Sequence, residues 1–186
     1  MRLLTALKGD QNMQLPPEHY RPCVGIMVFN EDGDIFVAKR LTNKKINDPN
    51  EKLWQMPQGG IDPGEDILQA AKRELFEETN IKDTDVKLIS QTDDWLTYDL
   101  PQTYLKKSWN GKYKGQAQHW VLFQFTGSEN DINVISPGGG SFEAEFTDWC
   151  WERSENVADL IIDFKRDLYR EVISIFTPII KQHLGQ

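Results

Sequence analysis

The sequence lacks any long hydrophobic run, and its first 20 residues lack the apolar centre of a secretory signal. No apolar stretch approaches the roughly 18 residues that cross a bilayer. Lys8, Gly9 and Asp10 interrupt the few apolar residues at the start of the chain. We therefore expect a cytoplasmic protein that does not associate with membranes.

Cysteine is scarce, and positive charge is scarce relative to negative charge. Cys23 and Cys150 are too few for a disulfide framework and lack metal-ligand spacing, so two reduced thiols are expected. With 21 Lys and Arg against 29 Asp and Glu, the net charge is −8. General binding of DNA or RNA needs an excess of cations, so this class of function is disfavoured, although local basic patches remain compatible with the charge.

The length of 186 residues is typical of a single domain with one active site. Residues 1–19, which end shortly after Pro16 and Pro17, are expected to form a flexible N-terminal arm. Residues 20–186 are expected to form the domain. Nothing in the sequence indicates an oligomeric state.

Short β-rich runs are interspersed with two helical patterns. Strands are expected within residues 24–30, 34–40, 53–57, 86–91, 94–100, 119–126 and 146–151, and Asp32-Gly33 is typical of a hairpin turn between the first two. Residues 41–50 are expected to form a loop. Helices are expected over residues 65–79 and from about residue 163 to beyond residue 176, with Pro178 bending or ending the second. Hairpins combined with strand–helix alternation predict an α/β sandwich with a mixed sheet.

Glu74, Glu77 and Glu78 share one side of the first predicted helix. At about 100° per residue, Glu78 falls within the apolar face of that helix and Glu74 lies at its edge. Like charges at this spacing repel, and burying an unpaired carboxylate costs on the order of several kcal/mol. Arg73 projects to a different side from Glu78, whereas Mg²⁺ is commonly held by a few carboxylates together with water and phosphate oxygens. An ordinary solvated acidic face is the alternative, and the position of Glu78 disfavours it.

Glycines at positions 59, 60 and 64 precede this helix in the segment PQGGIDPGE. Glycine allows a backbone carbonyl or amide to approach a metal or a phosphate closely. A tight connection between a strand and a helix is the alternative interpretation.

Gly59, Glu65 and the run Arg73-Glu74-Leu75-Phe76-Glu77-Glu78-Thr79-Asn80-Ile81 have the spacing of the Nudix box. Over about residues 20–176 the sequence resembles Nudix hydrolases, in particular the bacterial RNA pyrophosphohydrolases and the similar dinucleoside polyphosphate hydrolases. Segments such as LWQMPQGGID and DFKRDLYREV carry this resemblance outside the box. Asn80 departs from the usual glycine, but asparagine is the next best residue for a left-handed helix end. The 41–50 loop looks long and residues 136–144 look like an insertion.

The resemblance implies a Nudix-type α/β/α sandwich and a Mg²⁺-dependent pyrophosphohydrolase, with Mn²⁺ as a substitute and more than one ion in the site. Arg73 and Glu65 would support the site structurally. Glu145 would bind a metal or accept a proton from water, with Glu143 as second choice. The implied catalytic residues are Glu74, Glu77, Glu78 and Glu145, and the implied metal ligands are these four and the backbone carbonyl of Gly59.

The resemblance also implies that Arg21, Arg40, Phe164 and Lys165 contact the substrate, with Phe164 stacking on a base near the RNA end. Surface salt bridges for the arginines and core packing for Phe164 are the alternatives. Four lysines near residue 110 either steer a polyanion or are simply solvated (Lys106, Lys107, Lys112 and Lys114).

The leading hypothesis is removal of pyrophosphate from the 5′-triphosphate end of RNA, a step that initiates mRNA decay. The alternatives are asymmetric hydrolysis of dinucleoside polyphosphates such as diadenosine tetraphosphate, and a non-catalytic Nudix module that binds nucleotides.

Overall fold

The structure, a computed structural model, describes residues 15–42, 52–105 and 111–186. Most of the N-terminal arm, most of the 41–50 loop, Lys106 and Lys107 lie outside the described residues, so the expectations for them stay predictions. No helix in the described ranges is both long enough and apolar enough to cross a membrane.

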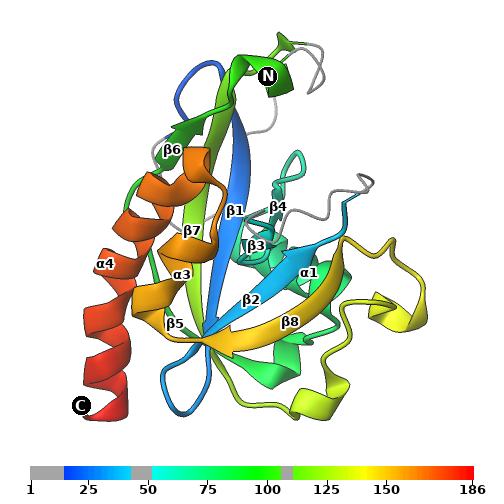
Figure 1. Cartoon of the computed structure of the whole chain (residues 1–186), viewed down its shortest axis with the longest axis vertical. Helices are drawn as coiled ribbons and strands as arrows, with labels where there is room; N and C mark the ends of the chain where they lie inside the picture. Colours follow the sequence, from blue (N-terminus) through cyan, green and yellow to red (C-terminus); the bar gives the residue numbers. More distant parts are fainter. Residues whose placement is uncertain (1–14, 43–51, 106–110) are drawn as a thin grey trace, which may run out of the picture.

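A mixed sheet of eight strands forms the centre of the protein (Figure 1). The strands are β1 (Tyr20–Phe29), β2 (Ile35–Arg40), β3 (Trp54–Gln55), β4 (Gln58–Gly60), β5 (Val86–Gln91), β6 (Leu96–Asp99), β7 (Gly115–Phe125) and β8 (Phe146–Glu152). The helices are α1 (Ile67–Thr79), α2 (Gln102–Leu105), α3 (Ser154–Leu160) and α4 (Arg166–Leu184). Short 3₁₀ turns lie at Asp83–Asp85, Glu129–Asp131, Pro137–Gly139 and Asp163–Lys165.

The order of the main strands is β3-β2-β1-β7-β5, with β4 paired to β1, β6 to β7 and β8 to β2. The long central pair, β1 and β7, is parallel from Tyr20 opposite Gly115 to Phe29 opposite Gln124, while the other pairs are antiparallel. A mixed sheet is therefore confirmed.

Alternate residues of β1 point to opposite faces of the sheet and so build two separate cores. Val24, Ile26 and Val28 pack with the apolar residues of α1. Met27 and Phe29 pack with those of α3 and α4 on the other face. Helices thus cover both faces of the sheet, and the predicted α/β/α sandwich is confirmed (Figure 1).

Helix α1 begins two residues later than the predicted position 65. Asp66 is extended and its side chain accepts a hydrogen bond from the Gln69 backbone N–H at 2.9 Å, while the Gln69 side chain accepts from the Asp66 N–H, forming a capping box. At the other end, Asn80 adopts a left-handed conformation with φ of 64°. The expectation for Asn80 is confirmed.

Of the two alternatives for Pro178, bending or ending the second helix, the ending is wrong. Asp163–Lys165 is a 3₁₀ turn, α4 begins at Arg166, and the helix continues past Pro178 to Leu184. Phe176 and Ile180, on either side of the proline, are buried against the sheet. Their packing offsets the hydrogen bond that proline cannot donate.

Candidate active site

Glu78 lies on the face of α1 that points into the protein, as the helical spacing predicts. It is only 3% exposed, and its Oε2 accepts a hydrogen bond from the Gln58 backbone N–H at 3.1 Å. Burial is the largest cause that raises the pKa of Glu78 well above its ordinary value, and the nearby Glu145 carboxylate adds to it. A buried carboxylate of this kind needs a positive charge to remain ionised.

Arg73 supplies positive charge to the other carboxylates. Its Nε donates to Glu65 at 2.8 Å and its Nη1 donates to Glu74 at 2.8 Å and to Glu77 at 3.4 Å. Its Nη2 donates to the Gly60 carbonyl at 2.9 Å. The hydrogen bond from Arg73 is the largest cause that lowers the pKa of Glu65. Arg73 therefore joins Glu65, β4 and two of the three box glutamates, but no hydrogen bond or ion pair joins it to Glu78.

Gly59 lies directly against Glu74. A Cβ atom built on Gly59 would lie 1.9 Å from the carboxyl carbon of Glu74, so no side chain fits there without displacing the carboxylate. Burial is the main cause that raises the pKa of Glu74, and Arg73 opposes it. The β4 backbone at Gly59 and the Glu74 carboxylate are consequently in close contact.

The oxygen donors of α1 and β4 fit a hard divalent cation in chemistry, since carboxylates and a backbone carbonyl are the ligands that Mg²⁺ prefers. Within the described ranges, no three acidic, histidine or cysteine side chains are arranged to hold a metal. Arg73 engages Glu74 and Glu77 instead, and Gln58 engages Glu78.

Glu74 and Glu145 line a cleft of about 460 Å³, together with five other sequence-predicted site residues, namely Arg21, Arg40, Gly59, Phe164 and Lys165. They come from β1, β2, β4, α1, the segment before β8 and the turn before α4. Glu77, Glu78, Arg73 and Glu65 do not line this cleft, and neither does Glu143. Of the two candidate carboxylates near β8, Glu145 is therefore the one in the cleft.

The position of Glu145 is fixed through its backbone. Its carbonyl accepts a hydrogen bond from the Leu41 N–H at 2.7 Å, just after Arg40 at the end of β2. The carboxylate itself is exposed toward the cleft.

Lys165 is a buried cation at the floor of the cleft and is only 5% exposed. Its Nζ donates to Gln58 Oε1 at 2.9 Å. Burial, followed by repulsion from Arg40, lowers the pKa of Lys165 to about 7. Gln58 thus contacts Lys165 through its side chain and Glu78 through its backbone.

Sequence reasoning missed a set of polar groups that surrounds Lys165. Gln118 Nε2 donates to Gln58 Oε1 at 3.1 Å and to Gln116 Oε1 at 3.0 Å, and the Tyr98 hydroxyl donates to Gln116 Oε1 at 2.7 Å. The available signal was the pair of alternating glutamines that precede the apolar run of β7, since both point to one face of a strand.

Phe164 has a position compatible with both alternatives considered from sequence, core packing and contact with the substrate. It packs at the margin of the core formed by α4, and it also lines the cleft. Its ring centroid lies 5.9 Å from that of Tyr98 and 5.4 Å from that of Tyr104. The cleft therefore has an aromatic part to its wall, formed by Phe164, Tyr98 and Tyr104.

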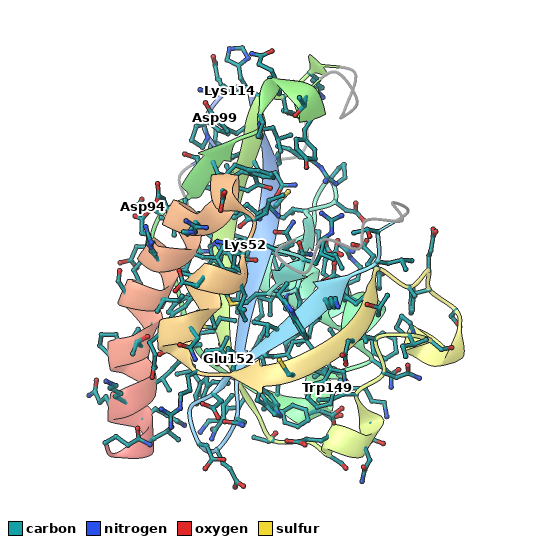
Figure 2. All side chains as sticks on the ribbon, viewed as in Figure 1. Lys52, Asp94, Asp99, Lys114, Trp149 and Glu152 are labelled. Carbon is teal, nitrogen blue, oxygen red and sulfur yellow. The ribbon has the colours of Figure 1, made fainter. Side chains whose placement is uncertain are left out.

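The described lysines of the basic segment are Lys112 and Lys114, and they lie outside the candidate active-site cleft. Lys114 Nζ is 4.0 Å from Asp99 and 4.4 Å from the centre of the Tyr20 ring, at the tip of the molecule (Figure 2). Neither Lys112 nor Lys114 lines the cleft.

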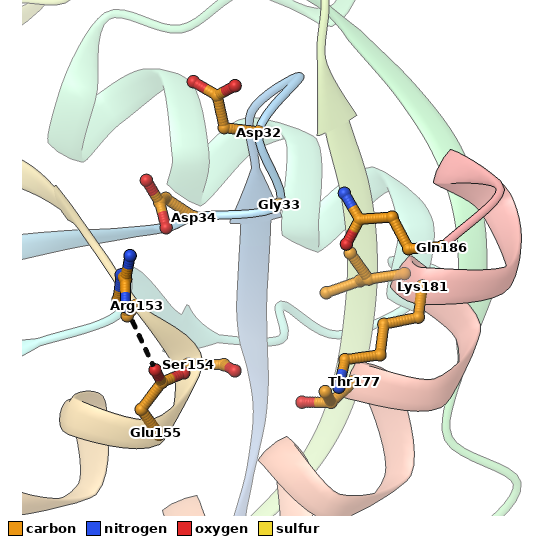
Figure 3. A pocket seen from close by; sticks show the side chains of 10 residues that line it. Asp32, Gly33, Asp34, Arg153, Ser154, Glu155, Thr177, Lys181 and Gln186 are labelled. Atoms are coloured by element: carbon orange, nitrogen blue, oxygen red, sulfur yellow. Dashed lines mark ion pairs between the residues drawn. The ribbon is translucent and has the colours of Figure 1, made fainter.

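Another hollow, of about 430 Å³, lies between the β1–β2 turn and the end of α4 (Figure 3). Asp32 and Asp34 stand on the turn, Lys181 on α4, and an Arg153–Glu155 ion pair of 3.7 Å on the remaining side. None of the predicted site residues lines this hollow, so it is separate from the candidate active site.

A mixed α/β/α sandwich with a glutamate-rich helix beside a cleft that holds both cations and carboxylates suits an enzyme that acts on phosphate groups. The NUDIX domain family matches residues 19–172. The chain therefore belongs to the Nudix family.

Curated relatives match nearly the whole chain. An RNA pyrophosphohydrolase of Rhodopseudomonas palustris (strain BisB18) is 47% identical over 162 residues, which cover 87% of this chain and 90% of the relative. An RNA pyrophosphohydrolase of Azorhizobium caulinodans is 47% identical over 157 residues, which cover 84% of this chain and 92% of the relative.

Solved structures share the fold at low sequence identity. The E. coli dihydroneopterin triphosphate pyrophosphohydrolase has a TM-score of 0.60 at 17% identity, with 84% of this chain and 98% of that chain covered. A C. elegans Ap4A hydrolase complex has a TM-score of 0.55 at 18% identity, with the same coverage of 84% and 98%.

Proposed function

We propose that this protein hydrolyses the 5′-triphosphate end of RNA, releasing pyrophosphate and leaving a monophosphate end. The observation that carries the proposal is that acidic groups, cations and an aromatic ring line one cleft. RNA pyrophosphohydrolases that are 47% identical over most of both chains support the choice of substrate.

The glutamates form the proposed metal site. Glu74, Glu77, Glu78, Glu145 and the Gly59 carbonyl would hold Mg²⁺, with room in this donor set for more than one ion and for Mn²⁺ as a substitute. Divalent cations bound there would neutralise phosphate oxygens and lower the pKa of a water molecule. Glu74, Glu77, Glu78 and Glu145 are the proposed catalytic residues, and Arg73 with Glu65 supports them.

Glu145 is the proposed acceptor of the proton from the attacking water. Its carboxylate is exposed to the cleft, unlike that of Glu78. Its backbone bond to Leu41 holds it beside the end of β2. A carboxylate held in place at the edge of a phosphate-binding cleft can take a proton without a large rearrangement.

The cations and the aromatic ring that line the cleft would hold the substrate. Arg21 and Arg40 present guanidinium groups, whose fork geometry suits phosphate oxygens. Lys165 adds a third positive charge from the floor of the cleft when it is protonated. Phe164 is the proposed stacking surface for a base near the cleaved phosphates.

The test is metal-dependent turnover by the purified protein, with 5′-triphosphate RNA and diadenosine tetraphosphate compared by kcat/KM and the products identified. Mg²⁺-dependent release of pyrophosphate from RNA with the higher kcat/KM is the expected result. A higher kcat/KM for the dinucleotide would make the protein a dinucleoside polyphosphate hydrolase that uses the same site.

Glu74→Gln keeps the size of the side chain and removes one charge of the metal site. We expect it to lower kcat by at least about a hundredfold while the folded state persists. Glu171→Gln, on the exposed side of α4, is the matched control and is expected to leave turnover unchanged. Hydrolysis that is unaffected by Glu74→Gln would contradict the proposed role of the glutamates.

A further inference from the structure

Gln118 is a fully buried polar side chain on the central strand β7. Its backbone pairs with Cys23 of β1 on one side and with Leu96 of β6 on the other, so its position is fixed from both sides. Its side chain is 0% exposed, and Trp120 and Leu122, which follow on the same face of the strand, are buried in the core. Burying an amide in such a place costs free energy that an apolar side chain would not. The position therefore points to a role other than core packing.

Gln118 forms a closed circuit of side-chain contacts with Gln58, Gln116, Tyr98 and Lys165. Its Nε2 donates to Gln58 Oε1 at 3.1 Å and to Gln116 Oε1 at 3.0 Å. Gln116 Oε1 also accepts from the Tyr98 hydroxyl at 2.7 Å, and Gln58 Oε1 also accepts from Lys165 Nζ at 2.9 Å. The circuit closes because Lys165 Nζ lies 5.2 Å from the centre of the Tyr98 ring, within the range of a cation–π contact. Both of these contacts of the ammonium group thus lead back to the Gln118 amide.

The direction of every hydrogen bond in the circuit follows from Lys165. An ammonium group can only donate, so Gln58 must present its carbonyl oxygen to it. The same oxygen then receives one N–H of Gln118, and the other N–H of that amide goes to the Gln116 oxygen. With the Gln118 amide reversed, its oxygen would face two other amide oxygens and repel them. Only one arrangement of the three amides therefore satisfies the circuit.

This arrangement leaves the Gln118 Oε1 atom unpaired. The atom is buried and finds no hydrogen-bond partner within residues 15–42, 52–105 and 111–186. An unpaired buried acceptor lowers stability. An apolar residue at this position would remove the acceptor, while Gln58 would keep Lys165 as a donor and Gln116 would keep Tyr98. The circuit thus holds Gln118 at a cost in stability, which is typical of a residue retained for function.

We propose that Gln118 is a positioning residue, which holds Gln58 directly and Tyr98 through Gln116, so that the Lys165 ammonium group stays at the wall of the active-site cleft. The other four residues of the circuit line the cleft, whereas Gln118 does not. A lysine side chain has many rotamers, and holding it in one place before the substrate arrives reduces the ordering that binding requires. The inference rests on the proposed function, because it assigns Gln118 a role in presenting a proposed substrate contact.

The first experiment compares Gln118→Met with the wild type. Methionine has nearly the length of glutamine but no N–H donor. We expect kcat/KM for 5′-triphosphate RNA to fall about tenfold, the scale of one hydrogen bond, while the midpoint of thermal unfolding stays the same or rises. Gln124→Met is the matched control, since Gln124 lies further along β7 beside His183 and outside the cleft, and its turnover should not change. Unchanged turnover in Gln118→Met, or a loss of turnover accompanied by a lower unfolding midpoint, would overturn the proposal.

A double-mutant cycle separates positioning from packing. Lys165→Met and the double variant Gln118→Met/Lys165→Met are compared with the two single backgrounds by kcat/KM. If Gln118 acts through Lys165, its substitution is expected to change kcat/KM less than about twofold once the ammonium group has been removed. An equal loss in both backgrounds would show an effect that does not involve Lys165, and the proposal would then be wrong.

Failure of the proposed function gives a different result. If the wild type releases no pyrophosphate from RNA with any divalent metal ion, the assignment of activity fails irrespective of Gln118. The positioning role is then tested by NMR of protein labelled with nitrogen-15 on its lysine side chains, with Lys165→Met used to assign the Lys165 signal. Faster hydrogen exchange of the Lys165 ammonium group in Gln118→Met than in the wild type supports the role, and an unchanged rate overturns it.

Discussion

Asn80 binds Gly138 across a gap of 58 residues: its Oδ1 accepts a hydrogen bond from the Gly138 backbone N–H at 3.1 Å. Its Nδ2 donates to the Asp131 carbonyl at 2.7 Å. Asn80 thus provides the left-handed end of α1 and also ties that end to the segment that leads to Glu145. A glycine would provide the first property but not the second.

We predict that Asn80→Gly lowers the free energy of unfolding by about 1 kcal/mol. Two hydrogen bonds of about 1 kcal/mol each are lost, and part of that loss is offset because glycine adopts a positive φ without strain. Asn80→Ala loses the same bonds and strains the backbone, so about 2 to 3 kcal/mol is expected. Urea unfolding measures both. Equal stability of Asn80→Gly and the wild type would show that the side-chain tether contributes nothing.

Gly59→Ala is predicted to lower turnover much more than stability. The new methyl group would overlap the Glu74 carboxylate, which is the flexible end of a side chain and can move away. Moving it would disturb the proposed metal site while the strand pairing of Gly59 with Val24 persists. The measurements are the Mg²⁺ concentration for half-maximal activity and the midpoint of thermal unfolding. Gly60→Ala is the comparison for metal binding, because its methyl group would meet Arg21, a proposed substrate contact, instead of Glu74. It is expected to lower turnover without changing the Mg²⁺ concentration for half-maximal activity.

Phe164→Ala is predicted to lower kcat/KM for 5′-triphosphate RNA by at least about tenfold, since aromatic stacking contributes roughly 1 to 3 kcal/mol per base. The Mg²⁺ concentration for half-maximal activity should stay unchanged, because the ring contacts of Phe164 are with Tyr98 and Tyr104, which are not proposed metal ligands. Phe164→Leu retains apolar volume and serves as the control for core packing. If RNA turnover and Mg²⁺ activation decline together, Phe164 acts only as a core residue.

Lys165→Met is predicted to reduce the dependence of stability on pH. Burial lowers the pKa of Lys165 to about 7 from an ordinary 10.5, so between these values the unfolded chain binds more protons than the folded protein. Lys165 therefore makes the free energy of unfolding rise with pH across this window, by at most about 1.4 kcal/mol per pH unit, and the gain is lost as pH falls toward 7. The groups that face it are Arg40, Cys23, Glu78 and Glu145.

The measurement for Lys165 is urea unfolding of the metal-free protein at pH 7, 8 and 9. The stability of Lys165→Met minus that of the wild type is expected to decrease steadily over this range. Lys181→Met, at an exposed position on α4, should show a constant difference. A constant difference for Lys165→Met as well would mean that its ammonium group stays protonated in the fold.

Helical spacing was sufficient to predict that Glu78 is buried, because the position of a side chain around a helix depends only on local geometry. The same spacing placed Arg73 on a different side from Glu78, and the structure agrees. The interaction of Arg73 with Glu65 and with the Gly60 carbonyl depends on how β4 packs against α1. No local rule gives that information.

Tertiary packing also explains what the sequence did not predict. Gln58–Gly60 forms a strand because β1 offers it a partner, although two glycines in three residues favour a turn. Lys165 meets Gln58 across 107 residues, and that contact follows from the complete sheet rather than from either segment. Its place in the cleft was expected only from the resemblance to Nudix hydrolases.

The hydrogen bond from Leu41 to the Glu145 carbonyl has a consequence for how this protein can be altered. It joins the end of the strand that carries Arg40 to the residue proposed to accept the proton from water. An insertion or deletion in the chain after Leu41 would shift the arginine and the carboxylate together. We therefore expect substrate preference and turnover to change together when this loop is altered, and a graft of the loop from a relative should carry the segment before β8 with it.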